Sequence, residues 1–478
     1  MIRCVWSSIL RCYPARDESI GNHFMQTHMT TSTSPTGKTG RRAKIAIIGG
    51  GSLFCAELVR CFILHINMLK GCHITLMDID TANLDLIYTI STRLLQQAGA
   101  DLTLERTTVL EDALEDADFV LTTFRTGGLQ ARLLDEKLPL QYGLLGHDTV
   151  GPGGFFYALR TAPVVAGIAA TIEKVAPKAF LLNYTTPSTI ITEAIAHSSG
   201  IRVIGLSNSP ARSIHLLARM AGVEAAPGKR LYPRTVGLNH GNWTTSVWRE
   251  GVDVLPQIVA WCENYIADQP AMAPDNYALM MLITLTAHYK AIPSYHMHHY
   301  YFPEQVRNFL LRKATSPAED ILAKLPSILA QYREESRKKL PQLMNLPEDS
   351  LSGDYTLDVL RSILNDTGEE WVLNVQNNGS INFIDDDRVV EVPCRVDARG
   401  VTPLAQGDGG LELDQTGLIA LLAEYEGATA RAALWGTRRE AIKALASNPL
   451  VMSYSKAEQI YDVMAVAHAR YLPERLLK

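Results

Sequence analysis

The sequence has no pair of cysteines in a CxxC arrangement, and its seven cysteines are an odd number, scattered between Cys4 and Cys394. That spacing excludes the disulfide framework of a small secreted protein and the paired cysteines of a structural zinc site. It favours a chain whose thiols stay reduced and pack as small apolar side chains. We therefore expect a cytoplasmic protein.

Long runs of one residue type are also missing. Apart from the short basic stretch 38–44, lysine and arginine are dispersed, and the formal net charge is -5. This balance gives no reason to expect a nucleic-acid partner. No uninterrupted apolar run reaches the roughly 18 residues that a membrane-spanning helix needs, so we expect no membrane span. The 478 residues, 47% hydrophobic and 20% charged, have the composition of a globular protein with one large or several smaller domains.

Residues 1–42 differ from the rest of the chain. The tract 29–42 consists of threonine, serine, glycine and basic residues without apolar periodicity, which is typical of disorder. The segment before it lacks the clean apolar core and the small-residue cleavage site of a signal peptide. We interpret residues 1–42 as a disordered leader, or as an extension that precedes a true start at Met25 or Met29.

Strands and helices alternate from residue 43 to about residue 210. Apolar and β-branched runs predict strands at 44–48, 74–77, 107–109, 119–123, 179–183 and 203–206, with helices at 54–63, 84–98, 157–175 and 189–197 between them. The alternation predicts an α/β fold built on a Rossmann-type doubly wound parallel sheet. After residue 210 the pattern changes to strands at 234–239 and 244–249 and longer helices at 277–288 and 321–339. We expect residues 211–478 to form a second, mixed α/β C-terminal domain.

A glycine-rich turn, residues 49–52 (GGGS), joins the first expected strand to the first helix. Such a turn lets backbone amides at a helix N-terminus approach a pyrophosphate closely, although the third glycine of the usual fingerprint is missing. Asp78 ends the next strand, where a carboxylate accepts hydrogen bonds from the adenosine ribose and favours NAD over NADP. Residues 43–210 are therefore predicted to bind NAD. The predicted contacts with NAD are Gly49, Gly51, Ser52, Asp78 and Asn183.

Polar segments follow the later strands of the same sheet. Arg125 comes after the strand at 119–123, and a glycine-dense segment, 146–154, surrounds His147 and Asp148. Three further segments, 183–187, 205–210 and 237–243, contain Asn183, Ser207, Asn208 and His240. Because ligands bind outside the carboxyl ends of parallel strands, these side chains are expected to converge on one pocket. Arg125 offers that pocket a fixed cation for an anionic group.

Taken together, these segments resemble glycoside hydrolase family 4, the NAD-dependent 6-phospho-glycosidases and their relatives. The resemblance runs from about residue 44 to the end of the chain and also includes 374–379, 389–393 and 448–450. It implies a redox mechanism in place of a carboxylate pair. NAD takes hydride from C3 of the sugar, a tyrosine removes the acidified C2 proton, the aglycone leaves by elimination, water adds, and the hydride returns.

The resemblance also implies roles for single residues. Tyr295 corresponds best to the tyrosine base, which needs a cation or metal nearby to lower its pKa. Asp148 corresponds to an acid for the leaving group. His240 corresponds to one of the two usual metal ligands, but the other, a cysteine, is Ser207 here, which puts a bound Mn²⁺ in doubt because a hydroxyl is a much poorer ligand than a thiolate. Without metal, His240, Asn208 and Ser207 are the candidate donors to a C3 oxyanion.

Two further departures lie in the sugar-binding region, where Thr186 replaces an asparagine and His147-Asp148 replaces a Gln-Glu pair. Three changes in one pocket favour an altered substrate, and NAD-dependent sulfoquinovosidases are relatives that act on a glucoside with a C6 sulfonate. We therefore predict hydrolysis of sulfoquinovosides, with a metal-dependent 6-phospho-glucosidase as the alternative, since Arg125 would serve either anion. The predicted substrate contacts are Arg125, His147, Asn183, Asn208 and Ser207.

Two functions of other classes remain open. An NAD-dependent sugar or hydroxy-acid dehydrogenase would share the nucleotide-binding half, but it would produce NADH and release no aglycone. A non-catalytic NAD-binding sensor would explain the loss of the cysteine, but not the retention of Tyr295, His240 and Asn183. The pocket residues favour the glycosidase, because fold alone does not fix function. Family relatives are commonly oligomers, so we expect a homodimer or homotetramer with oligomer contacts in residues 211–478.

Overall fold

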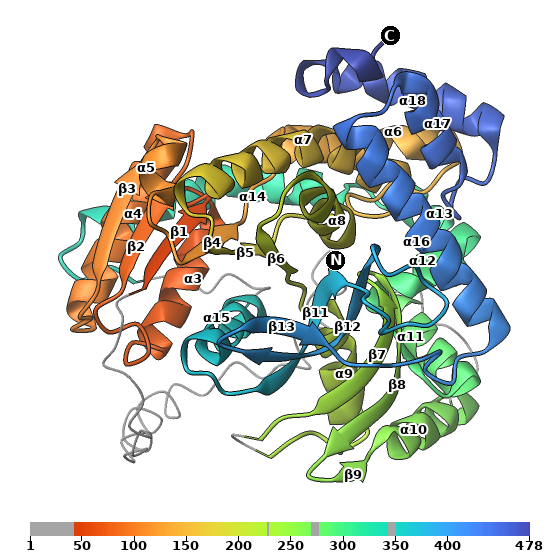
Figure 1. Ribbon diagram of the computed structural model, residues 1–478. Helices are drawn as coiled ribbons and strands as arrows, with labels where there is room; N and C mark the ends of the chain where they lie inside the picture. Colours follow the sequence, from red (N-terminus) through yellow and green to blue (C-terminus); the bar gives the residue numbers. More distant parts are fainter. Residues whose placement is uncertain (1–42, 227–228, 269–276, 343–349) are drawn as a thin grey trace.

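The computed structural model describes residues 43–226, 229–268, 277–342 and 350–478 (Figure 1). The expected leader, residues 1–42, lies outside the described residues. Element labels follow Figure 1. The parallel strands are β1 (Lys44–Ile48), β2 (His73–Met77), β3 (Thr103–Thr107), β4 (Phe119–Thr122), β5 (Phe180–Asn183) and β6 (Arg202–Gly205). The remaining strands are β7 (Tyr232–Leu238), β8 (Gly241–Arg249), β9 (Val252–Asp253), β10 (Ile292–Pro293), β11 (Glu369–Gln376), β12 (Val389–Asp397) and β13 (Gly400–Pro403).

The centre of the fold is a nine-stranded sheet in the order β13-β12-β11-β6-β5-β4-β1-β2-β3. Strands β1 to β6 pair in parallel, and the strand order reverses direction beside β1. Strand β11 pairs antiparallel with β6 and extends the sheet through β12 and β13. The predicted Rossmann-type fold is therefore confirmed, and part of the C-terminal half completes its sheet.

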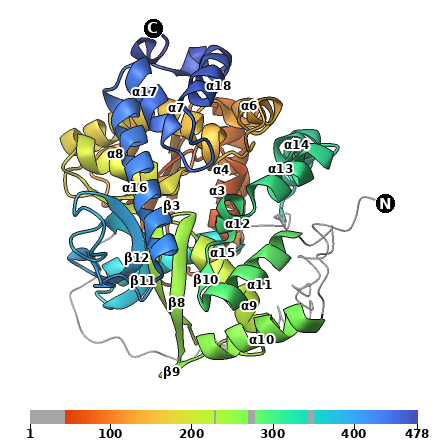
Figure 2. The ribbon, with the colours of Figure 1, turned by 90° about the vertical axis from the view of Figure 1, so that its right-hand side faces the viewer.

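Helices cover both faces of this sheet. Those of the first half are α3 (Leu53–Leu64), α4 (Thr81–Gln97), α5 (Leu110–Leu114), α6 (Gly128–Gln141), α7 (Gly151–Val175), α8 (Ser188–Ser198) and α9 (Ser209–Met220). Those of the second half are α10 (Leu255–Asp268), α11 (Tyr277–Tyr289), α12 (His298–Tyr301), α13 (Pro303–Arg312), α14 (Pro317–Arg337), α15 (Ser350–Leu364), α16 (Leu413–Leu434), α17 (Arg438–Ala446) and α18 (Tyr454–Ala467), with short 3₁₀ turns at Tyr295–Met297, Ala469–Tyr471 and Glu474–Leu476. Helix α15 packs against α3 on one face, whereas α16 packs against α7 and α8 on the other (Figures 1 and 2).

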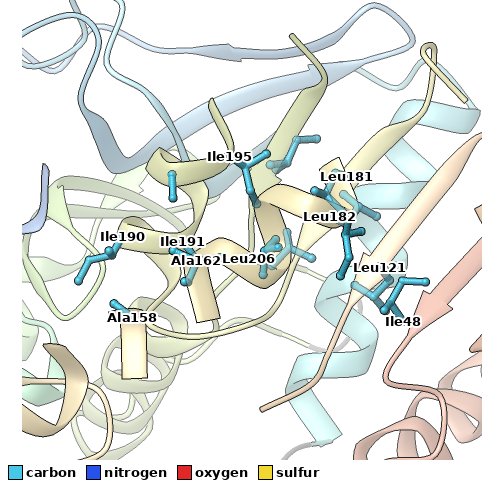
Figure 3. Close-up of a cluster of buried hydrophobic side chains, with 14 of the residues drawn as sticks. Ile48, Leu121, Ala158, Ala162, Leu181, Leu182, Ile190, Ile191, Ile195 and Leu206 are labelled. Atoms are coloured by element: carbon cyan, nitrogen blue, oxygen red, sulfur yellow. The ribbon is translucent and has the colours of Figure 1, made fainter. Parts of the chain in front are cut away.

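The apolar interior is continuous between the two halves. Ile48, Leu121 and Leu182 from neighbouring strands meet Ile191 and Ile195 of α8 in the cluster drawn in Figure 3. The same cluster reaches Val390, Ala433 and Tyr461 in the C-terminal half. Burial of apolar surface is the main favourable contribution to folding, so this shared core holds the two halves together. The predicted division at residue 210 stays a prediction; residue 210 lies in α9, and β7 begins at Tyr232.

Two local predictions were wrong. The strand predicted at 107–109 lies at Thr103–Thr107, since it is an edge strand with polar side chains and lacks the apolar run of a buried strand. The helix predicted from Tyr157 begins at Gly151. Gly153 and Gly154 pack so closely that a Cβ on either would lie 2.0 Å from the His147 oxygen and 2.3 Å from the Thr149 carbonyl carbon, respectively. These glycines are therefore required by packing inside a helix, rather than by a loop.

Helix α7 is long and apolar enough to cross a membrane by length and composition alone. Two-thirds of its most apolar window is buried inside the protein, between α8, α6 and α16. A buried core helix passes the same test, so α7 is explained by its packing. It supplies the rigid support on which the loop before it, with His147 and Asp148, is held.

Candidate active site

The glycine turn lies where the predicted nucleotide site requires it. The amides of Gly49 and Gly50 both donate to the Met77 carbonyl at 2.9 Å, which ties the turn to the end of β2. Gly49 has φ +100°, and a Cβ there would lie 2.6 Å from the Thr123 oxygen. Ser52 is the N-cap of α3, and its hydroxyl accepts the Cys55 amide at 3.3 Å. The turn thus leads directly into the N-terminus of α3, the kind of position that suits a pyrophosphate.

Asp78 closes the same site from β2. Its Oδ2 accepts the Gly51 amide at 2.9 Å, and its Oδ1 accepts the Asp80 amide at 3.0 Å. A Cβ on Gly51 would approach Oδ2 to 3.0 Å. The carboxylate therefore lies directly beside the turn, as a residue that accepts ribose hydroxyls must. These residues fit a dinucleotide with an unphosphorylated ribose.

The loop before α7 brings His147 and Asp148 into the pocket. Gly146 permits this approach, because a Cβ there would lie 1.8 Å from the Glu136 oxygen of α6. The Thr149 amide donates to Nδ1 of His147 at 3.1 Å, so the imidazole proton lies on Nε2. His147 is therefore a neutral donor, because burial also lowers its pKa.

Asp148 is held by two guanidinium groups. Its Oδ2 lies 2.8 Å from Nη2 of Arg125 and 3.2 Å from Nε of Arg132. Burial alone would raise the pKa of Asp148, but Arg132 and Arg125 outweigh it and hold that pKa well below its usual range. Asp148 is thus a carboxylate that accepts hydrogen bonds and has no proton to donate in this arrangement. Its predicted acid role remains untested, and the charge state does not favour it.

Arg125 retains an unused donor. The guanidinium lies over the Tyr157 ring, 4.2 Å from the ring centroid. Its Nη1 is buried and has no hydrogen-bond partner among the described residues. A buried donor without a partner costs free energy unless a ligand or water satisfies it. Arg125 therefore points to an acceptor group, as expected of a residue that binds an anionic substrate.

Five histidines, His147, His240, His296, His298 and His299, form one cluster of rings beside Asp148. The ring centroids of His240 and His296 are 3.7 Å apart, and His147 makes edge contacts with His296 and His299 at 5.4 Å and 4.8 Å. Burial lowers the pKa of His240 to about 3, with a smaller contribution from His147. Burial likewise lowers the pKa of His298 to about 4. At neutral pH these rings are uncharged donors and acceptors.

Tyr295 lies at one side of the histidine cluster, 5.9 Å from the His296 ring and 5.3 Å from the His298 ring. Burial raises the pKa of Tyr295, while the cation Arg212 of α9 opposes that shift. The expected lowering of the tyrosine pKa is therefore absent in this arrangement. Arg212 is nevertheless a cation of the kind that a tyrosine base requires.

The other residues predicted to contact NAD or the substrate lie in different surroundings from Arg125, His147 and Asp148. Asn183 is fully buried, and its side-chain amide is hydrogen-bonded to Thr122, Thr185 and Thr192 at 3.0 to 3.2 Å; that it contacts NAD and substrate stays a prediction. Its hydrogen-bond capacity is used within the protein, and it shapes the turn after β5. Ser207 and Asn208 line a cavity of about 280 Å³. His240 lines a different, water-sized cavity.

The residues present do not fit a firmly held metal ion. Over the described ranges, no three histidine, cysteine, aspartate or glutamate side chains are arranged to hold one. The Ser207 hydroxyl accepts the Ser209 amide at 3.2 Å and lines a separate cavity from His240. The neutral His240 ring alone is too small a donor set for a divalent transition metal. The sequence-based doubt about Mn²⁺ stays a prediction, and we derive no catalytic step through a metal.

Purified protein should therefore contain divalent metal at well below one ion per chain, because Ser207 supplies no thiolate. Elemental analysis after gel filtration measures this directly. S207C is the matched variant. It should raise the Mn²⁺ content of the protein if the new thiolate and His240 can approach each other around the ion. One Mn²⁺ retained per wild-type chain, and lost in H240A, would contradict the expectation.

Several site residues were not found from the sequence. Arg132 sits on α6 seven residues after Arg125 and was not predicted; its spacing of four residues to Glu136, which it contacts at 2.7 Å, is the only sequence signal that could have marked it as paired. His296 and His299 follow Tyr295 closely in the sequence, but nothing in a linear pattern shows that they pack on His147. Glu426 comes from α16, far away in the sequence, to line the His240 cavity.

Comparisons with known proteins agree with this geometry. The Family 4 glycosyl hydrolase model matches residues 44–223, and the Family 4 glycosyl hydrolase C-terminal domain model matches residues 235–451. A probable 6-phospho-beta-glucosidase of Bacillus subtilis (strain 168) is 34% identical over 445 residues, which cover 90% of this chain and 97% of that one. The 6-phospho-beta-glucosidase of Escherichia coli (strain K12) is 28% identical over 91% of this chain and 97% of its own.

Solved structures give the same result. The 6-phospho-beta glucosidase of Thermotoga maritima, solved with manganese, NAD+ and glucose-6-phosphate, superposes with a TM-score of 0.78 at 27% identity, covering 90% of this chain and 99% of that one. The two family models together span most of the described chain and include the glycine turn, the histidine cluster and the β7–β8 turn. This protein belongs to family 4 of the glycosyl hydrolases.

Proposed function

We propose that this protein hydrolyses 6-phospho-glucosides with NAD as a cofactor that is regenerated in each turnover. The observation that carries the proposal is the unpartnered, buried Nη1 of Arg125 beside His147 and Asp148. A phosphate oxygen is a strong acceptor for such a donor. The names of the relatives support phosphate rather than the sulfonate that we predicted first, because they are 6-phospho-glucosidases.

When bound at the glycine turn, NAD supplies the hydride acceptor that oxidises C3 and later returns the hydride. The C3 ketone acidifies the C2 proton, so a weak base suffices for its removal. Tyr295 is the proposed base at its Oη. It must first lose its own proton, and Arg212 is the cation that favours the phenolate.

The histidines and Asp148 handle the oxygen atoms of the sugar. His240 is neutral at working pH and can donate a hydrogen bond to the C3 oxygen without carrying a charge. His147 carries its proton on Nε2 and is a donor for the departing oxygen. Asp148 keeps Arg125 and Arg132 in place through its two ion pairs. In this scheme the ionised carboxylate orients the guanidinium groups, and the Nε2–H of His147 stabilises the departing oxygen by a hydrogen bond.

The test is aglycone release from nitrophenyl 6-phosphoglucosides, both anomers, and from nitrophenyl sulfoquinovoside, with NAD present and with or without EDTA. We expect release from a phosphate substrate that requires NAD, with no net NADH. Release only from the sulfonate would overturn the phosphate assignment and restore the sulfoquinovosidase. R125K should weaken either reaction, because lysine cannot offer the second, fork-spaced donor.

The same assay separates the functions of other classes. Net NADH production without nitrophenol would indicate a dehydrogenase. NAD binding with neither product would indicate a sensor. A homo-oligomeric state and a cytoplasmic location remain proposals, and size-exclusion chromatography with light scattering tests the first of them.

A further inference from the structure

His240 occupies an unusual backbone position. It is the second residue of the two-residue turn, Asn239-His240, between β7 and β8. Its φ is +67°, a left-handed conformation that glycine or asparagine adopts readily and a histidine does not. A residue held in such a conformation needs surrounding contacts that over-determine it, and such residues cluster at functional sites. Contacts from the surrounding structure must therefore hold this turn.

A single buried carboxylate binds both sides of the turn. Glu391 of β12 is fully buried and accepts hydrogen bonds on both oxygens. Its Oε1 accepts Nδ2 of Asn239 at 3.1 Å, directly before His240, and its Oε2 accepts Nδ2 of Asn242 at 2.5 Å, two residues after it. Asn242 also donates to the Leu238 carbonyl at 2.9 Å. The carboxylate thus clamps the chain on either side of His240.

Other buried groups complete the clamp. Asn374, directly opposite Glu391 in the β11–β12 ladder, donates to Oε1 at 3.0 Å. The Asn239 amide donates to the Thr189 hydroxyl of α8 at 3.0 Å. That hydroxyl in turn donates to Oδ1 of Asn374 at 3.3 Å. Elements from three parts of the chain therefore meet at one two-residue turn.

The three donors of this cluster favour a carboxylate at position 391: burial raises the pKa of Glu391 to about 7, and the hydrogen bonds from Asn239 and Asn374 oppose that rise. All three side chains that face Glu391 are amide N–H donors, and a carboxylate is an acceptor on every lone pair. A glutamine would satisfy the donors on one side only, because its own NH₂ would face an asparagine NH₂ on the other. The polar network lies in the interior, where an unsatisfied or opposed donor is costly. Size alone therefore does not explain the residue.

We infer that Glu391 is a positioning residue for the reaction: it fixes the Asn239–His240 turn in the left-handed conformation that places the His240 ring against His296 at the sugar. The inference rests on the proposed function, in which His240 donates to the C3 oxygen. Glu391 itself touches neither cofactor nor substrate. It acts from β12, on the antiparallel extension that the C-terminal half adds to the sheet (Figure 1).

The expected result for E391Q is a loss of about 100-fold in kcat, the size of effect that a displacement of about 1 Å in an active site produces. KM for the 6-phosphoglucoside and Kd for NAD should change little, because the hydrogen bonds of Arg125 and of the glycine turn go to residues other than Glu391, Asn239 and Asn242. The matched control is E193Q, another buried carboxylate, which pairs with Arg388 at 2.9 Å and does not contact the turn. Its melting temperature should fall similarly, with kcat retained.

A double-mutant cycle distinguishes positioning from general destabilisation. If Glu391 acts through His240, E391Q added to H240A should cause no further loss of kcat, whereas independent structural damage would add to it. Full additivity, or a loss in E193Q equal to that in E391Q, would overturn the inference. N239A, which removes one donor and leaves the β12 core intact, takes the place of E391Q if that variant does not fold.

The outcomes also separate this inference from the proposed function. If H240A keeps the wild-type kcat, the proposed catalytic role of His240 is wrong, and the inference that rests on it falls with it. If H240A is inactive but E391Q keeps kcat within about twofold, only the positioning by Glu391 fails. A crystal structure of E391Q gives an answer without any substrate: His240 should leave the positive-φ region, and an unchanged φ would refute the clamp.

Discussion

Replacing Asp148 with asparagine should lower kcat/KM by about 10³-fold. The carboxylate pairs with Arg125 and Arg132 at 2.8 and 3.2 Å, and its side chain is only 10% exposed. Removing one partner of a buried charge pair typically costs about 3–5 kcal/mol, because the opposite charge is left uncompensated. Here two guanidinium groups lose their common partner, and Arg125 is the residue proposed to bind the substrate anion. Nitrophenol release at several substrate concentrations gives kcat and KM separately.

The control for this prediction is D85N. Asp85 also pairs with an arginine, Arg106 at 2.5 Å, but both side chains are about half exposed. Exposed pairs contribute little to stability, so D85N should leave both activity and melting temperature almost unchanged. If D148N keeps kcat/KM within tenfold of wild type, the ion pairs at Asp148 do not organise the site.

The pH profile tests the charge state of the same residue. Arg132 and Arg125 hold the pKa of Asp148 below its usual value of 3.8, so the carboxylate is charged above that pH and loses its contribution only as the pH falls below it. Above about pH 4, the pH profiles of the wild type and D148N should therefore have the same shape, because Asp148 does not titrate there. A wild-type limb near neutral pH on which activity falls as the pH rises, and which is absent in D148N, would restore Asp148 as the proton donor.

Much of the fold was predictable because it depends on local chemistry. The glycine turn, Asp78 at the end of β2 and the apolar parallel strands each leave a short, recognisable pattern. The two strands of the β7–β8 hairpin were also predicted, at 234–239 and 244–249, whereas their antiparallel pairing was not. Strand β3 was misplaced because an edge strand, paired on one side only, has no need of the apolar run that marks its neighbours.

The site was predictable only in part, because its residues are joined by packing between distant segments. Arg125, His147, Asp148 and His240 were predicted, and the structure brings them together. Asn183 has the same polar character in the sequence, yet its amide is spent on three threonines. No single segment shows which asparagine faces a ligand and which supports a turn. Similarly, Glu391 lies about 150 residues beyond His240, so only the fold reveals their connection.

Replacing Gly49 with alanine should weaken NAD binding by at least about 100-fold and abolish NAD-dependent hydrolysis. The added Cβ would lie 2.6 Å from the Thr123 oxygen and 2.8 Å from its carbon, both backbone atoms that cannot move aside alone. At φ +100° an alanine is also strained irrespective of the space around it. The turn would have to shift, and the N-terminus of α3 would be displaced relative to Asp78, which accepts the Gly51 amide; a 100-fold loss of affinity corresponds to about 2.8 kcal/mol. Isothermal titration with NAD measures the effect.

The matched change is Gly167 to alanine, on the exposed side of α7. A Cβ there meets nothing within 4 Å, and the backbone is helical. Alanine stabilises an exposed helical position by about 0.5–1 kcal/mol relative to glycine, so G167A should bind NAD normally and melt slightly higher. The two variants make the same chemical change, a single methyl group, and differ only in what that methyl meets. If G49A binds NAD as well as G167A does, the cofactor does not lie on this turn, and the nucleotide site assigned to the end of β1 is wrong.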